Sequence, residues 1–434
     1  MFNFNTQPIK YKFQGEMTVP GDKSIAHRAI ILASLAKGVT QISNFSFSED
    51  LTTTVKLFQN LGVKMHVEPT TKDMIIKGSN HNFKPVTHNL NLNNVGELQS
   101  LIMGMLATVP DTYTLQGGEF LSKRPSDNLA TLLSDMGADL TRLSDNYLPL
   151  QIKGSDNLRG IIYQQDIASA QIKSGLIFAS LYANSETEIL RKMPTRDHTE
   201  VLANYFGADI TTKPDLIVVN PKNTELTGKN LTIPGDFSSA ALYIAGALLS
   251  KDSELTLHQV GLNSTRTGML DVARQMGATI NIINRSTNSV EPYGDLIVRS
   301  QKLHGTTITA EQVPFIIDEI PIIALMASQA SGTTVIEDIH DVHLQISDRI
   351  RNMRVELAKL GIVMEVNDDS IVIQGNQTIN VKDDVDSHND HRIAMMLCIA
   401  SNLTATPFQI KNIEAIDISY PDFISDMRKV LVGA

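Results

Sequence analysis

The chain has 434 residues, of which 42% are hydrophobic and 19% are charged, and its formal net charge is −10. This composition can supply two hydrophobic cores, but it offers no basic stripe interleaved with aromatic residues, so we expect no nucleic-acid partner. The longest apolar runs, such as 242–249 and 320–327, are too short to span a bilayer, which argues against a membrane protein.

The first 77 residues predict one β-α-β-α-β-β unit. Apolar residues alternate where we expect strands, and they recur at helical spacing where we expect helices. The N-terminal stretch MFNFNTQPIKYKF lacks the apolar core of a secretory signal, which favours a cytoplasmic location. The expected elements are a strand at 17–19, a compact apolar helix at 24–36, a strand at 40–44, an amphipathic helix at 49–61, and two short strands at 64–67 and 74–77.

The unit recurs along the chain. Five apolar-periodic runs end in a glycine followed by a fresh apolar alternation, and the intervals between these glycines are 75, 70, 70 and 84 residues. Glycine directly after such a run is typical of a left-handed helix cap, so each is predicted to end a helix. A sixth unit would finish near the C-terminus. The five residues are Gly62, Gly137, Gly207, Gly277 and Gly361.

A second repeat divides the six units into two groups of three. Residues 19–28 (VPGDKSIAHR) return 214 positions later as 233–242 (IPGDFSSAAL), with the Pro-Gly-Asp turn kept and the Lys, His and Arg lost. We therefore expect two domains of about 200 residues with a boundary near Gly235. We expect the repeated Pro-Gly-Asp turn to have a structural role in both copies, and the functional residues to lie at the positions where the copies differ.

Each unit is expected to begin its first helix in a polar segment. Helix N-termini present free N–H groups and partial positive charge, which suit phosphate and carboxylate groups. Ser24 and Arg28 share one helix face and could hold one anion, with Lys23 at the leading edge. The alternative is a capped surface helix with solvated Lys and Arg. The six starts are 21–24, 94–97, 168–171, 235–238, 317–320 and 389–392.

The single cysteine, Cys398, lies within the apolar run 393–400. We expect it to be a buried and unreactive thiol, and one cysteine excludes an internal disulfide.

Residues 19–28 resemble the signature of the 5-enolpyruvylshikimate-3-phosphate (EPSP) synthase family. Seven further motifs resemble those of this family and occur in the same order, so the resemblance covers nearly the whole chain. They are 123–125 (KRP), 168–174 (ASAQIKS), 196–200 (RDHTE), 234–240 (PGDFSSA), 265–268 (TRTG), 317–321 (IDEIP) and 389–395 (NDHRIAM).

The resemblance implies an α/β fold, the inside-out α/β barrel of the enolpyruvyl transferases. In that fold two domains, each of three β-α-β-α-β-β repeats, close on the ligand in a cleft between them. The first strand belongs to the C-terminal domain, so the domains are predicted as 22–235 and as 1–21 with 236–434.

The resemblance also implies an activity, 3-phosphoshikimate 1-carboxyvinyltransferase. This enzyme moves the enolpyruvyl group of phosphoenolpyruvate to the 5-hydroxyl of shikimate 3-phosphate and releases phosphate, in chorismate and aromatic amino-acid biosynthesis. It implies two small-molecule substrates, no metal and no organic cofactor, and a monomeric enzyme.

Residue roles are implied in the same way. Asp318 would be the base at the hydroxyl, and Lys23 would contact both substrates. Asp318 is also placed to cap the helix that begins near Ile320. Shikimate 3-phosphate would be bound by Lys23, Ser24, Arg28, Ser169, Ala170, Gln171, Asp318 and Gln345. Phosphoenolpyruvate would be bound by Lys23, Gly96, Arg124, Gln171, Arg349 and Arg392.

Four positions depart from the family pattern and make this a divergent member. Where the family has Gly-Thr followed three residues later by Arg, this chain has Glu97 and Ser100, so a cation is missing and a carboxylate is added. Where the family has Lys-Glu, it has Gln345 and Ile346, and an alkyl side chain cannot carry a proton.

Three hypotheses follow from these departures. The chain is a shikimate-pathway transferase in which Glu97 or His343 takes over proton transfer, or it is an impaired homologue that binds phosphorylated ligands without efficient turnover. The third is a transferase for another acceptor, such as a nucleotide sugar. That hypothesis is weaker, because the sister family commonly uses a loop cysteine and Cys398 lies in an apolar helix.

Overall fold

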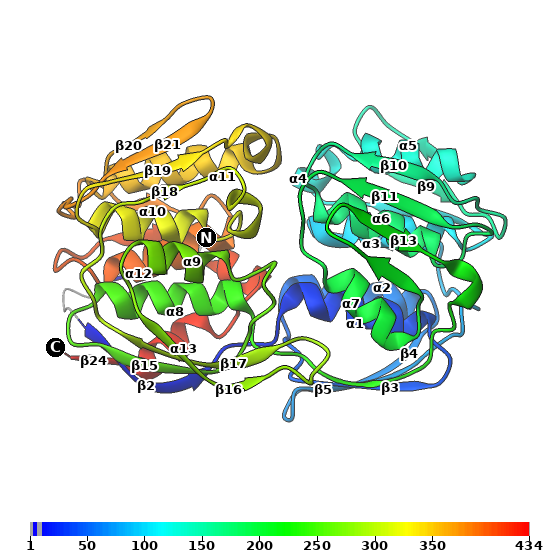
Figure 1. Ribbon diagram of the computed structural model, residues 1–434, viewed down its shortest axis with the longest axis horizontal. Helices are drawn as coiled ribbons and strands as arrows, with labels where there is room; N and C mark the ends of the chain where they lie inside the picture. Colours follow the sequence, from blue (N-terminus) through cyan, green and yellow to red (C-terminus); the bar gives the residue numbers. More distant parts are fainter. Residues whose placement is uncertain (1–2, 7–10, 434) are drawn as a thin grey trace. The chain divides into compact units, whose positions relative to one another are not determined.

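The computed structural model describes residues 3–6 and 11–433, with backbone only for 3–5 and 340–347 (Figure 1). The chain divides into two compact units, which we call the first unit (Gly21–Ile233) and the second unit (Met1–Pro20 with Pro234–Ala434). These limits differ by one or two residues from those of the predicted domains, 22–235 and 1–21 with 236–434.

The first unit, all of whose residues are described, contains three four-stranded sheets. In each sheet one pair of strands is parallel and two are antiparallel. The strand orders are β14 (Asn230–Thr232), β3 (Val39–Ser43), β5 (Asp73–Lys77), β4 (Lys64–Glu68); then β6 (Asn89–Asn91), β7 (Thr112–Gln116), β9 (Leu150–Lys153), β8 (Asp139–Arg142); and β10 (Ile162–Gln165), β11 (Thr187–Arg191), β13 (Leu216–Val219), β12 (Ile210–Thr212). The helices are α1 (Lys23–Leu35), α2 (Glu49–Asn60), α3 (Gly96–Ala107), α4 (Glu119–Ser122), α5 (Asp127–Met136), α6 (Ala170–Ser180), α7 (His198–Phe206) and the short η1 (Pro221–Asn223).

The second unit repeats this plan with one larger sheet. Its described strands are ordered β16 (Ile280–Ser286), β17 (Tyr293–Arg299), β15 (Glu254–Gly261), β2 (Tyr11–Thr18), β24 (Leu431–Gly433); then β18 (Thr307–Ile308), β19 (Thr333–Glu337), β21 (Ser370–Gln374), β20 (Met364–Val366); and β1 (Asn3–Asn5), β23 (Gln409–Lys411), β22 (Val385–Asp386). Its helices are α8 (Phe237–Leu249), α9 (Gly268–Gln275), η2 (Val313–Phe315), α10 (Ile320–Gln329), α11 (His340–Lys359), α12 (His391–Ser401), η3 (Ile413–Ile418) and α13 (Phe423–Val430).

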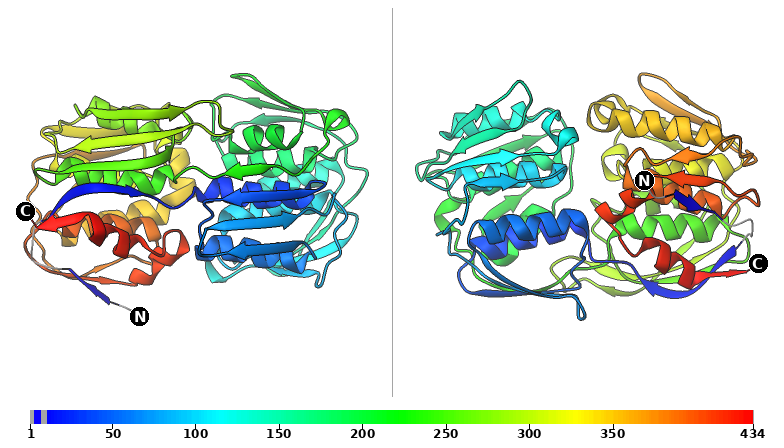
Figure 2. Two further views of the ribbon diagram at one scale, coloured as in Figure 1. Left: turned by 90° about the horizontal axis from the view of Figure 1, so that it is seen from below. Right: turned by 180° about the vertical axis from the view of Figure 1, so that it is seen from behind.

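The two units exchange their first strands. Strand β2, from the N-terminal part of the chain, pairs in parallel with β15 of the second unit, and Figure 2 shows it in blue beside that strand. Strand β14, which ends just before the chain enters the second unit, takes the corresponding place beside β3 of the first unit. The first strand of the chain therefore belongs to the second unit.

Three helices in each unit are buried on nearly every side. In the second unit α8, α10 and α12 pack on one another, and the sheets lie outside them (Figure 1). In the first unit α1, α3 and α6 have the same character, whereas α2, α5 and α7 are buried on one face only. A helix without a polar face can be stable only inside a core. The predicted α/β class with repeated β-α-β-α-β-β units is confirmed.

The five predicted helix stops are also confirmed. Gly62, Gly137, Gly207, Gly277 and Gly361 all have positive φ, between 80° and 115°. Side chains other than glycine rarely adopt this left-handed conformation, which lets the backbone leave the helix and start the next strand.

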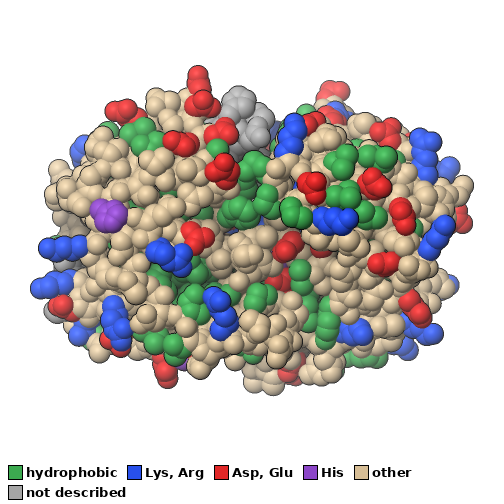
Figure 3. Space-filling model, in the orientation of Figure 1, with side chains coloured by type: hydrophobic (Ala, Val, Ile, Leu, Met, Phe, Trp, Pro, Cys, Tyr) green, Lys and Arg blue, Asp and Glu red, His purple; other side chains and the backbone are tan. Residues whose placement is uncertain are grey.

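Cys398 is fully buried in α12, and burial raises the pKa of its thiol to about 12, in agreement with the expected unreactive role. In the described parts of the chain, no helix combines the length and apolar character needed to cross a bilayer. On the face drawn in Figure 3, basic and acidic side chains are interspersed.

The close approach of two central helices depends on Gly104. A Cβ atom added to Gly104 in α3 would overlap the backbone carbonyl of Gly175 in α6, which cannot move independently of its helix. We expect Gly104→Ala to lower the free energy of unfolding by about 1–3 kcal/mol through overpacking. Denaturant unfolding followed by circular dichroism measures this effect.

Gly433→Ala is the matched control, because an added Cβ there meets no heavy atom within 4 Å. It should change the free energy of unfolding by less than about 0.5 kcal/mol. Equal effects of the two substitutions would contradict the packing argument.

Candidate active site

Helix α1 carries the cations that the sequence singles out. Asp22 caps the helix by accepting a hydrogen bond from the N–H of Ile25 at 2.9 Å, so Lys23 is its first residue. The ammonium group of Lys23 forms a hydrogen-bonded ion pair with Asp50, in the first turn of α2, and both side chains are largely buried. Lys23 is thus a partly buried cation with a carboxylate partner, not a solvated surface residue.

Arg28, one turn further along α1, is more deeply enclosed. Its guanidinium donates to Thr199 Oγ1 at 2.7 Å, Ser174 Oγ at 3.1 Å and the carbonyl oxygen of Ser24 at 2.8 Å. Its charge is compensated by Glu97 Oε1 at 2.6 Å. The predicted pairing of Ser24 and Arg28 around one anion is present, since Ser24 Oγ donates to Glu97 Oε2 at 3.0 Å.

The Glu97 carboxylate is held in its ionised form. Burial opposes ionisation, but the Arg28 guanidinium, by its charge and its hydrogen bond, brings the pKa of Glu97 well below its ordinary value. The anion that Ser24 and Arg28 hold is therefore a side chain of the protein itself.

A second cluster adjoins the first at the start of α3. Gly96 has no side chain to keep the Arg124 guanidinium away, and a Cβ at this position would overlap Nη1 of Arg124. Nη2 of Arg124 donates to Gln171 Oε1 at 3.2 Å, at the start of α6. Ser169 caps α6 by accepting from the N–H of Ile172 at 3.3 Å, and Ala170 is the first residue of that helix. Neighbouring residues Gly96 and Glu97 thus join the Arg124 cluster to the Arg28 cluster.

In the second unit, three guanidinium groups surround the carboxylate of Asp318. Arg266 Nη1 lies 3.3 Å and Arg392 Nη2 3.1 Å from Oδ2, and Arg349 Nη1 lies 3.7 Å from Oδ1. A narrow pocket beside this group is lined in part by Ser238, Asp318, Glu319 and Arg392. Two further carboxylates contact these arginines, since Asp236 Oδ1 lies 3.5 Å from Arg266 Nη2 and Asp390 Oδ2 lies 2.6 Å from Arg349 Nε, so the three cations share the cluster with three carboxylates.

The predicted capping role of Asp318 is wrong. The N-cap of α10 is Glu319, whose side chain makes no capping hydrogen bond, and Asp318 lies one residue earlier. Its carboxylate is directed to the arginines because charge-assisted contacts to guanidinium groups are stronger than a capping bond.

Asp390 holds the side chain of one of these arginines and caps the helix that carries another. It accepts a hydrogen bond from Arg349 Nε at 2.6 Å and caps α12 by accepting from the N–H of Arg392 at 2.8 Å. Although burial favours the neutral acid, the Arg349 guanidinium lowers the pKa of Asp390 to about 2.

The structure therefore brings the predicted residues into three groups. Lys23, Ser24 and Arg28 lie at α1; Gly96, Arg124, Ser169, Ala170 and Gln171 lie at α3 and α6; and Asp318, Arg349 and Arg392 form the group in the second unit. Ser100 lies in α3 and is half-buried. The side chains of His343, Gln345 and Ile346 lie outside the described residues, and only their backbone, in α11, is described.

Sequence reasoning missed several partners of these groups. Arg266 lies in the recognised motif 265–268, so the motif could have identified it as a site residue. Asp390 likewise lies in the recognised motif 389–395. Ser174 and Thr199 also lie in recognised motifs, 168–174 and 196–200, and they reach α1 from 146 and 171 residues away. Asp50 reaches α1 from 27 residues away and lies in none of the recognised motifs.

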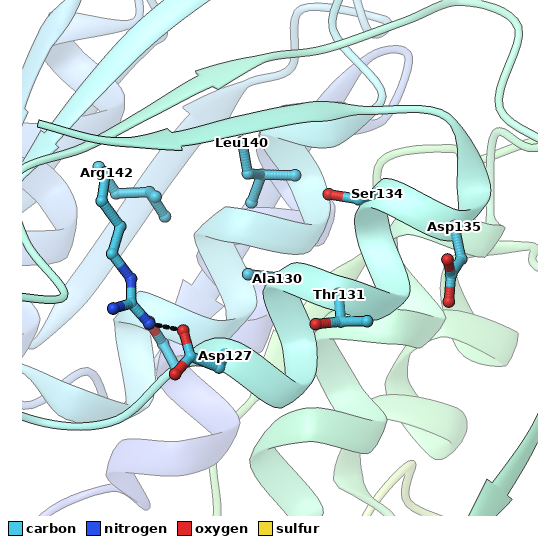
Figure 4. A pocket seen from close by; sticks show the side chains of 9 residues that line it. Asp127, Ala130, Thr131, Ser134, Asp135, Leu140 and Arg142 are labelled. Carbon is cyan, nitrogen blue, oxygen red and sulfur yellow. Dashed lines mark ion pairs between the residues drawn. The ribbon is translucent and has the colours of Figure 1, made fainter.

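Another pocket, of about 270 Å³, lies in the first unit between α5 and β8 (Figure 4). Asp127 and Arg142 form an ion pair at its edge, and Ala130, Thr131 and Leu140 line it. It includes none of the predicted site residues. Across the described residues, no group of three or more His, Cys, Asp or Glu side chains is placed to hold a metal ion.

Comparison with known proteins gives consistent results. The family model described as EPSP synthase (3-phosphoshikimate 1-carboxyvinyltransferase) matches residues 8–427. A curated 3-phosphoshikimate 1-carboxyvinyltransferase from Petrotoga mobilis is 40% identical over 417 residues, 96% of each chain. One from Leuconostoc mesenteroides is 39% identical over 428 residues, 98% of each chain.

Solved structures agree. An EPSP synthase from Acinetobacter baumannii has a TM-score of 0.86 at 34% identity, covering 99% of this chain and 98% of the other. The enolpyruvyl transferase NikO from Streptomyces tendae has a TM-score of 0.78 at 16% identity, with 98% of each chain covered, and shares the fold.

The Asp390–Arg349 pair predicts a specific pH dependence of stability. The pKa of Asp390 is lowered on folding from 3.8 to about 2, so its contribution is present above pH 4 and is lost as the pH falls through 2. The size of this contribution is about 2 kcal/mol. We expect Asp390→Asn to be less stable than the parent by this amount at pH 6 and nearly equal to it at pH 2, as measured by urea unfolding.

Asparagine also caps helices, so this substitution removes the charge and keeps the cap. Asp368→Asn, at an exposed position, serves as the control and should show no such dependence. A stability difference for Asp390→Asn that stays constant with pH would contradict the assignment.

Proposed function

Because this chain belongs to the EPSP synthase family, we propose that it transfers the enolpyruvyl group of phosphoenolpyruvate to the 5-hydroxyl of shikimate 3-phosphate and releases phosphate. The observation that carries the proposal is the convergence of Arg266, Arg349 and Arg392 on Asp318. Cations for a phosphate and a carboxylate, beside a carboxylate that can accept a proton, are what this reaction requires.

In the proposed mechanism the methylene carbon of phosphoenolpyruvate takes up a proton and the 5-hydroxyl oxygen attacks its neighbouring carbon. Asp318 accepts the hydroxyl proton. The resulting tetrahedral ketal phosphate loses phosphate, and the methyl group gives up a proton, so the enol ether is restored. Arg349 and Arg392 bind the phosphate and carboxylate and stabilise the charge that develops as phosphate leaves.

The groups of the first unit would bind the rest of the two substrates. Lys23 would contact both. Shikimate 3-phosphate would take hydrogen bonds from Ser24, Arg28, Ser169 and Gln171, with Ala170 packed beside it, and from Gln345 of the second unit. Phosphoenolpyruvate would lie at Gly96, Arg124 and Gln171. The contact of Arg124 with Gln171 supports a shared place for these two residues.

The names of the curated relatives favour this function over an impaired homologue or a transferase for another acceptor. The cleft between the domains, the monomeric state and the cytoplasmic location stay predictions.

The decisive measurement is phosphate release from phosphoenolpyruvate with and without shikimate 3-phosphate, together with calorimetry for each ligand. Release that depends on the acceptor and yields the enol ether would support the proposal. Binding of shikimate 3-phosphate without any release would refute turnover and leave a ligand-binding homologue. If neither ligand bound, the substrate assignment itself would be wrong.

The role of Asp318 predicts a separation of kcat from KM. Loss of a positioned acid–base group costs about 10²–10⁴ in rate, so Asp318→Asn should lower kcat by that factor with a much smaller change in the KM for shikimate 3-phosphate. Steady-state phosphate release measures both constants.

Asp271→Asn removes an exposed carboxylate of the same unit and should leave kcat unchanged. A kcat for Asp318→Asn within about twofold of the parent would exclude Asp318 as the base.

A further inference from the structure

Glu97 places its carboxylate between two hydrogen-bond donors, Ser24 and Arg28, that together could bind a ligand anion. Its two carboxylate oxygens accept from Ser24 Oγ at 3.0 Å and from Arg28 Nη1 at 2.6 Å. It is the second residue of α3, whereas Ser24 and Arg28 lie one turn apart on α1. The contact therefore joins two of the central helices through a ligand-like carboxylate.

The hydrogen-bonding capacity of these groups is nearly used up. A serine hydroxyl has one proton to donate, and that of Ser24 goes to Glu97. Arg28 has five N–H donors, and its bonds to Thr199, Ser174, the Ser24 carbonyl and Glu97 use four of them. Of these four partners only Glu97 is charged, so a ligand anion can take both Ser24 and Arg28 only by replacing the Glu97 carboxylate.

The exposed fractions of the two side chains indicate how a ligand anion could replace the Glu97 carboxylate. The side chain of Arg28 is 3% exposed and that of Glu97 is 17% exposed, so solvent reaches Glu97 before it reaches the guanidinium. Withdrawal of the Glu97 side chain would open Arg28 to a ligand, whereas the contacts to Thr199 and Ser174 would keep the guanidinium in place.

We propose that Glu97 is an internal anion that occupies the Ser24–Arg28 position, so that an anionic acceptor binds there only by displacing it. This inference rests on the proposed function for the nature of the acceptor. Glu97 is then a specificity-determining residue. An acceptor with a carboxylate at this position binds weakly, and one that offers a hydroxyl or ammonium donor to Glu97 binds without displacement.

The test compares the affinity of shikimate 3-phosphate for the parent and for Glu97→Gln, by calorimetry at constant ionic strength. Glutamine keeps the shape and removes the charge that repels a ligand anion a few ångströms away. We expect the Kd to fall by about tenfold or more. Glu97→Thr, which restores the residue typical of the family, should act in the same direction.

Glu119→Gln is the control, because it removes one exposed negative charge from the same unit and should leave the Kd unchanged. Thermal melting establishes that each variant is folded. An unchanged or higher Kd in folded Glu97→Gln would overturn the inference, as would an equal gain in Glu119→Gln. Failure of both Glu97 variants to fold would also overturn it, because the contact would then be a structural requirement.

Phosphate release measured on the same samples separates this inference from the proposed function. Acceptor-dependent release by the parent, with no gain of affinity in Glu97→Gln, would leave the function standing and reject the internal anion. A lower Kd for shikimate 3-phosphate in Glu97→Gln, with no phosphate release by the parent or by any variant, would support the internal anion and reject the proposed function.

Discussion

The arrangement of each unit depends on three helices that are buried on nearly every side. A charged side chain on such a helix is removed from water, so it must find partners inside the protein. Lys23 and Glu97 lie in the first turns of α1 and α3, whereas Arg28 and Arg349 lie further along α1 and α11. Each buried cation needs a carboxylate within reach, and Lys23, Arg28 and Arg349 all have one.

The duplicated turn shows how the two units use one framework differently. Asp22 and Asp236, at equivalent positions, both cap the helix that follows. The first copy places Lys23 and Arg28 on its helix, whereas the second has Phe237 and Leu242 there. The second unit brings a cation from elsewhere, since Arg266 donates to Ser238 at 2.9 Å. Both copies therefore keep the aspartate cap, but the cations beside it come from different segments of the chain.

Features that depend on residues close together in the sequence could be predicted, whereas contacts between residues far apart in the sequence could not. The helix stops depend on one glycine and its immediate neighbours, so the five left-handed caps were predictable. The anion held by Ser24 and Arg28 was predictable as a feature of one helix face. Its identity was not, because Glu97 meets Arg28 from 69 residues away. The role of Asp318 as a helix cap failed for the same reason, since three distant guanidinium groups outweigh a local bond to the backbone.

The second unit also contains a counterpart of the Glu97 contact, and the difference between the two is informative. Ser238, equivalent to Ser24, donates to Glu319, the N-cap of the second central helix of its unit, as Ser24 donates to a residue at the start of α3. Glu319 is 2% exposed, and the guanidinium of Arg266 bonds to Ser238 instead of displacing that contact. Both units thus have a serine–glutamate contact between helix starts, and at Glu319 this contact is buried. At Glu97 the same contact is partly open to solvent and holds the cation of the predicted acceptor site. A framework contact that has become accessible can be exchanged for a ligand, and this is the physical basis for treating Glu97 as a replaceable anion.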